Sequence, residues 1–247
     1  MHLIATVILG VTLTFGLSAQ TAEELVANNL RAKGGVDKIK ALRTLRISGR
    51  IQAGGFTALL DRDAVRPDLL RETFTIQGMS QIRAYDGAIG WQISPFEGRK
   101  DPELLGEDDL RDLREEADFF GPLVDYKEKG SKVEYLGHDL VDGDDAYRLK
   151  LTLLNGDIIY YYLDPDTCLE IRTEKLQFIR GSVRQSSTDL GSYKLVEGVY
   201  FPFSMERWNK QNPGARVKIT IDKIEANDAL NTAEFKMPST ATSGHEF

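Results

Sequence analysis

The chain has 247 residues, with 31 basic and 38 acidic side chains and a formal net charge of −7 at pH 7. A chain of this length can bury the core of one domain without disulfide support. The acidic balance argues against nucleic acid as a partner, because phosphate binding requires a basic face. The single cysteine, Cys168, excludes an internal disulfide and Cys-rich zinc or iron–sulfur sites.

The N-terminus has the pattern of an export signal. Its first 19 residues contain no Lys, Arg, Asp or Glu, and the segment from Leu3 to Phe15 is largely apolar. Such a segment is shorter than the roughly 20 residues that cross a bilayer and matches a signal-peptide core. We predict cleavage near Ala19, with an uncleaved N-terminal anchor as the alternative. The chain would then comprise a signal peptide (1–19), a single domain (20–238) and a flexible tail (239–247).

The mature chain is predicted to begin with helices and continue as a meander of strands. Thr21 and Glu24 have the spacing of a capping box, which predicts a helix ending at Gly34-Gly35. A short helical segment over 36–42 follows. From residue 45 to about residue 95, apolar and polar residues alternate between tight turns, which predicts antiparallel strands.

Residues 101–122 interrupt the strands and are predicted to form a helix. Acidic residues crowd its first turn, which suits the helix dipole, and Gly121-Pro122 ends it. The opposite face is nearly all charged, and Glu115, Glu116 and Asp118 are predicted to be solvated there. The apolar residues at helical spacing along one face are Leu110, Leu113, Ala117 and Phe120.

The second half returns to strands separated by turn signals such as Asn155-Gly156 and Glu197-Gly198. Its cleanest alternation runs through Val217, Ile219 and Ile221. Both halves together predict about 11 to 12 strands in an all-β protein with minor helices. A twisted antiparallel sheet of that size must curl or close, so its concave face has to be filled by side chains, helices or a ligand.

Catalytic motifs are not evident. The sequence lacks HExxH, GxSxG and the phosphate-binding glycine loops. His138 is predicted to lie in a surface turn, and Cys168 is predicted to be a partly buried thiol rather than a nucleophile. The acidic runs 142–145 and 164–166 do not have EF-hand spacing and are predicted to form turns.

The order and spacing of several motifs resemble those of bacterial outer-membrane lipoprotein-sorting proteins related to the periplasmic lipoprotein carrier LolA. The resemblance covers nearly the whole mature chain. The matching segments are Ala32 to Leu42 with Leu45 and Gly49, Val133 to Gly137, Asp142-Gly143 with Tyr147 to Leu149, Tyr162 to Thr167, Gly198 to Pro202, and Phe235 to Pro238.

The resemblance implies a half-open antiparallel barrel closed by helices. It implies an apolar cavity that holds lipid or lipoprotein acyl chains, in a periplasmic protein that works without a cofactor. We also predict a monomer that binds no metal. Membrane proteins would act as its transient donor and acceptor. Acyl chains need only an apolar concave surface, since each buried methylene contributes about 0.8 kcal/mol.

The helical insertion is then a predicted lid, and the strands beside it would supply the cavity wall. For each candidate residue, ordinary core packing is the alternative. Glu72, in register with Leu70 and Phe74, would place a carboxylate on the apolar face. The candidate ligand-binding residues are Phe74, Ile76, Ile82 and Trp91 in the wall and Leu113, Phe119 and Phe120 in the lid.

Two other classes of function remain open. The same fold could serve an envelope sensor or interaction protein that signals to a membrane partner. A hydrolase acting on lipid or envelope polymer is the third class, with His138 and Cys168 as its best candidates for catalytic groups.

Overall fold

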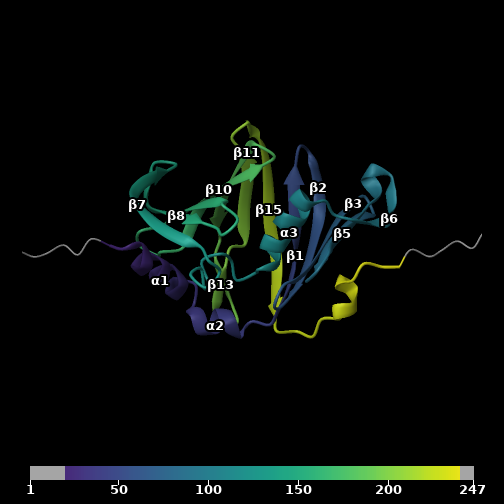
Figure 1. Ribbon diagram of the computed structural model, residues 1–247, viewed down its shortest axis with the longest axis horizontal. Helices are drawn as coiled ribbons and strands as arrows, with labels where there is room; N and C mark the ends of the chain where they lie inside the picture. Colours follow the sequence, from purple (N-terminus) through teal and green to yellow (C-terminus); the bar gives the residue numbers. More distant parts are fainter. Residues whose placement is uncertain (1–19, 240–247) are drawn as a thin grey trace, which may run out of the picture.

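The computed structural model describes residues 20–239, which form a curved antiparallel sheet with helices packed on it (Figure 1). The predicted signal peptide, and all of the predicted tail except Ser239, lie outside the described residues. None of the helices within 20–239 is long and apolar enough to cross a membrane.

Thirteen strands make up the main sheet, in the order β6-β5-β4-β3-β2-β1-β15-β14-β11-β10-β9-β8-β7. The sheet is open, with β6 and β7 at its edges, and the predicted all-β class is confirmed. The strands of the first half are β1 (Thr44–Ala53), β2 (Phe56–Val65), β3 (Leu69–Ile76), β4 (Met79–Asp86), β5 (Gly90–Ser94) and β6 (Arg99–Leu104). Those of the second half are β7 (Lys132–Val141), β8 (Asp144–Thr152), β9 (Ile158–Leu163), β10 (Glu170–Ile179), β11 (Ser182–Gly191), β14 (Ser204–Asn209) and β15 (Asn212–Ala226).

The two halves join where β15 pairs with β1. The register places Ile47 opposite Ile224 and Ile51 opposite Ile219. Strands that are far apart in the sequence therefore lie side by side in the middle of the sheet, with α3 drawn across this region in Figure 1. Because of this pairing, the apolar residues of β1 and β15 form one continuous surface.

The N-terminal helices α1 (Ala22–Ala32) and α2 (Val36–Ala41) cover one end of the sheet. The predicted capping box is confirmed: the Glu24 amide donates to the Thr21 hydroxyl at 3.1 Å, and the Thr21 amide donates to the Glu24 carboxylate at 2.8 Å. A small hairpin, β12 (Lys194–Val196) and β13 (Val199–Phe201), packs against the turn after α1. There Gly34 has φ of +123°, and a Cβ atom on it would lie 2.1 Å from the Gly198 carbonyl oxygen. Only glycine fits at this position.

The interruption of the meander differs in detail from the prediction for residues 101–122. Residues Arg99–Leu104 form edge strand β6, where Pro102 is tolerated because one side of the strand is unpaired. Helix α3 (Glu107–Ala117) is shorter than predicted, and Phe119 and Phe120 lie in the turns after it. Short 3-10 turns are η1 (Pro95–Glu97) and η2 (Thr232–Phe235).

Helix α3 rests on the β2–β4 part of the sheet through its apolar face. Leu113 and Ala117 are fully buried there, packed in one cluster with Leu70 and Tyr85. The predicted amphipathic character of this segment is therefore confirmed for its apolar side.

Candidate functional site

An apolar cavity of about 210 Å³ lies between the middle strands and the C-terminal end of α3. Its walls come from both chain halves because β15 pairs with β1. Alternation along each strand turns every second residue toward this face. The apolar lining consists of Leu45, Ile47, Leu60, Ala64, Phe119, Phe201, Pro202, Met205, Ile219, Ile221 and Ile224.

The cavity has one charged side, formed by Arg62, Glu116 and Arg207. Glu116 and Arg207 also line an adjoining hollow of about 400 Å³ over strands β9–β11. The apolar cavity therefore continues into a polar one. The remaining lining of the polar hollow is Asp112, Glu115, Pro122, Ile159, Tyr161, Thr173, Lys175, Gln177, Arg184, Ser186 and Thr188.

A buried charge cluster holds the wall beside the apolar cavity. Glu72 is only 1% exposed and is paired with Arg62, while Arg83 lies 4.0 Å from its other carboxylate oxygen. Arg62 also reaches Glu116 on α3, at 3.3 Å. Burial, followed by the negative charge of Glu72, raises the pKa of Glu116, and Arg62 opposes this shift. The prediction that Glu72 lies on the inner face is correct. Its buried charge is balanced by the nearby Arg62 and Arg83.

The charged face of α3 points into the sheet's concavity, which corrects the prediction that it is solvated. Glu115 accepts from Lys175 at 2.7 Å, and Asp112 is paired with Arg184 and accepts from Gln177 at 2.6 Å. The helix crosses the concave face, so both of its long sides meet strands. One side is held by apolar packing and the other by ion pairs.

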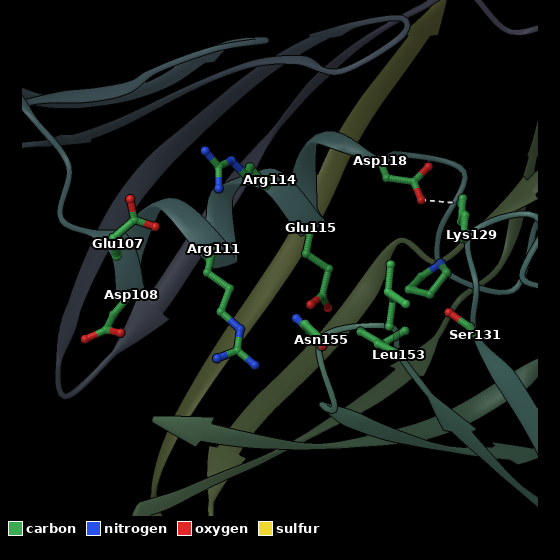
Figure 2. A pocket seen from close by; sticks show the side chains of 12 residues that line it. Glu107, Asp108, Arg111, Arg114, Glu115, Asp118, Lys129, Ser131, Leu153 and Asn155 are labelled. Atoms are coloured by element: carbon green, nitrogen blue, oxygen red, sulfur yellow. Dashed lines mark hydrogen bonds and ion pairs between the residues drawn. The ribbon is translucent and has the colours of Figure 1, made fainter. Parts of the chain in front are cut away.

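A third hollow, of about 690 Å³, lies between α3 and the β8–β9 turn (Figure 2). Arg111 and Glu115 leave the helix toward this turn, whereas Arg114 points the other way. Arg111 is paired with the fully buried Asp157, and Asp118 is paired with Lys129. Because most of its charged groups are engaged in ion pairs of this kind, we interpret this hollow as the place where the helix is anchored.

The predicted lid residues have different positions. Phe119 lines the apolar cavity and contacts the Phe120 ring edge-on, with the ring centroids 4.8 Å apart. Phe120 does not line this cavity, and the guanidinium carbon of Arg66 lies over its ring, 4.6 Å from the centroid. Leu113 is fully buried against the sheet, so it anchors the helix rather than lining the cavity.

The predicted wall residues divide between the two faces of the sheet. Phe74 packs with the cluster of Leu60 and Ile221, and Ile76 follows it on the same face. Ile82 and Trp91 lie on the opposite face, because the register pairs Arg83 with the inward Glu72 and with Gln92. Trp91 donates a hydrogen bond from Nε1 to the Phe235 carbonyl at 2.8 Å. The expectation that these two line the cavity is therefore corrected.

The residues considered for catalysis lie away from the apolar cavity. His138 is exposed on β7, rather than in a turn, with its Nδ1 atom 2.7 Å from Asp145. Cys168 is partly buried, and this burial, with the nearby Asp164, raises the pKa of its thiol. A raised pKa lowers the fraction of reactive thiolate.

Most of the cavity lining from β14 and β15, as well as Arg62 and Arg207, was not predicted from the sequence. The alternation of Ile219 and Ile221 was visible as a strand pattern. It did not show which strand would lie beside β15, and this pairing is what brings these residues to the cavity.

Comparison with known proteins supports the fold. No protein-family model and no curated protein sequence matches the chain. Solved structures do match it. A LolA superfamily protein from Nitrosomonas europaea has a TM-score of 0.60 at 12% identity, over 88% of this chain and 98% of that one.

Two further structures are similar to the same degree. An outer membrane lipoprotein-sorting protein domain from Vibrio parahaemolyticus has a TM-score of 0.59 at 11% identity, over 87% of this chain and 97% of that one. A DUF1329 family protein from Desulfovibrio piger has a TM-score of 0.59 at 16% identity, with the same coverage of both chains. Identities this low concern the fold alone. The chain has a LolA-like fold, as the resemblance of its sequence motifs implies.

Proposed function

We propose that this protein is an exported, periplasmic carrier that binds lipid or lipoprotein acyl chains and takes part in outer-membrane lipoprotein sorting. The observation that carries the proposal is the apolar cavity enclosed by the middle strands and Phe119. The LolA-like fold and the export-signal pattern of residues 1–19 support it. Binding of this kind needs no catalytic group, so the proposal is non-enzymatic.

The cavity suits transient binding. Each methylene moved from water into an apolar site contributes about 0.8 kcal/mol, so a few methylenes give affinity without permanent capture. Helix α3 is the proposed lid. Its ion pairs to β2, β10 and β11 can separate more readily in water than its buried Leu113 can leave the sheet.

The test is native mass spectrometry of protein purified gently from a periplasmic extract, followed by organic extraction of bound acyl species. Met205→Trp fills the cavity without removing apolar surface and should reduce the recovered acyl species several-fold. Ile82→Trp is the matched control, since Ile82 is also half-buried but lies on the other face of the sheet. Absence of acyl species from the unmodified protein would reject the proposal, as would equal recovery with Met205→Trp.

A further inference from the structure

Arg207 stands at the junction of the apolar cavity and the polar hollow. It lies on β14, lines both spaces and is an exposed residue. The other cations of this lining are paired: Arg62 with Glu72 and Glu116, Lys175 with Glu115, and Arg184 with Asp112. Within residues 20–239, Arg207 has no carboxylate within ion-pair distance and no side-chain hydrogen bond.

The groups around Arg207 leave its guanidinium available to a ligand. Thr188 lies directly opposite it in the β11–β14 register, and the next residue along the same face of β11 is Ser186. Both also line the polar hollow and offer hydroxyl donors. The charge of Arg207 acts on Glu116 of α3, where it opposes the rise in the pKa of that carboxyl, but Glu116 forms its ion pair with Arg62. A guanidinium flanked by hydroxyls suits a carboxylate or phosphate group.

We propose that the ligand is an amphiphile with an anionic headgroup, whose acyl chain occupies the apolar cavity and whose carboxylate or phosphate binds Arg207. This inference rests on the proposed carrier function and specifies its ligand class. The supporting observation is the position of the unpaired Arg207 guanidinium. It lies between the apolar lining that includes Met205 and Ile219 and the polar lining that includes Ser186 and Thr188. A neutral or cationic headgroup would leave the positive charge of Arg207 without an anionic partner.

The test is isothermal titration of the mature protein with amphiphiles that share a dodecyl chain, each below its micellar concentration. Dodecanoate and dodecyl phosphate are the anionic probes, monolauroylglycerol is the neutral probe and dodecyltrimethylammonium is the cationic probe. Inorganic phosphate tests the headgroup without a chain. We expect the anionic probes to bind about tenfold more tightly than the neutral one, the usual size of one hydrogen-bonded charge contact.

Arg207→Gln should remove most of that preference while the affinity for monolauroylglycerol stays within about twofold. Lys218→Gln is the matched control, because it removes one positive charge from an exposed residue on the opposite face of the same strand pair and should leave the preference intact. Equal affinity for anionic and neutral probes, or an unchanged preference in Arg207→Gln, would overturn the headgroup assignment and leave the carrier proposal standing. Inorganic phosphate bound as tightly as dodecyl phosphate would assign Arg207 to free anions instead. Failure of every dodecyl probe to bind would overturn the carrier proposal itself.

Discussion

Arg62 on strand β2 donates a hydrogen bond of 3.3 Å to Glu116 on helix α3, and the same guanidinium is paired with the buried Glu72. One cation thus serves two carboxylates, one from the sheet and one from the helix that covers it. The pKa of Glu116 is raised because burial and the charge of Glu72 disfavour its ionised form.

This raised pKa predicts a pH dependence of stability. Glu116 keeps its proton to a higher pH in the folded protein than in the unfolded chain. The free energy of unfolding should therefore decrease as the pH rises from the ordinary glutamate pKa through the raised one. Glu116→Gln cannot titrate and should lose that decline. Urea unfolding from about pH 4 to about pH 8 measures it. Glu128→Gln, at an exposed position, is the control and should follow the unmodified protein. Identical slopes for Glu116→Gln and the unmodified protein would contradict the prediction.

The Lys33–Glu170 pair predicts a pH dependence of stability in the opposite direction. Glu170 is buried, which by itself would raise its pKa, yet Lys33 at 3.1 Å and hydrogen bonds to the carboxylate hold that pKa below its usual value. This stabilisation is present above the ordinary glutamate pKa and is lost as the pH falls through the lowered one. Glu170→Gln should lower the free energy of unfolding at neutral pH by about 1–3 kcal/mol.

The same variant should also show a shallower loss of stability on acidification, measured by urea unfolding at several pH values. Glu128→Gln, at an exposed position, provides the comparison for removal of one acidic charge. A Glu170→Gln protein as stable as the unmodified one at neutral pH would count against the role given to this pair.

Gly34 is predicted to be intolerant of a side chain. Its positive φ and the approach of the Gly198 carbonyl leave no room for a Cβ atom. Gly34→Ala should therefore destabilise the protein by more than about 1 kcal/mol, because strain and a backbone shift add together. Gly191→Ala is the control: a Cβ atom at this position would have no neighbour within 4 Å, and the φ of Gly191 is not in the left-handed region. Thermal unfolding of the two variants distinguishes a local steric requirement from a general effect of replacing glycine.

Trp91 is predicted to hold the C-terminal segment rather than a ligand. Trp91→Phe removes the donor to the Phe235 carbonyl and leaves that buried acceptor unsatisfied, at a cost of about 1–3 kcal/mol. Hydrogen exchange should become faster across residues 232–238. Binding of dodecyl probes should stay unchanged, since Trp91 lies on the face opposite the cavity. If this variant lost probe binding while residues 232–238 kept their protection from exchange, Trp91 would belong to the binding site and the prediction would be wrong.

Local patterns in the sequence were enough to predict most of the elements. The capping box at Thr21, the alternation of Val217 to Ile221 and the turn signals each reflect short-range geometry, and the structure confirms them. Edge strand β6 was missed because its charged and proline-containing sequence has little strand propensity. It forms because β5 offers an unpaired edge.

Periodic patterns along the chain were sufficient to predict an all-β protein with a covering helix, because such periods depend only on neighbouring residues. The partners of each apolar or charged face depend instead on the tertiary structure. The pairing of β15 with β1 assembles the apolar cavity, and the crossing of α3 over the concave face turns Asp112, Glu115 and Glu116 toward cations of the sheet. Strand order and the orientation of a helix on a sheet depend on contacts between residues distant in sequence, which no local period encodes.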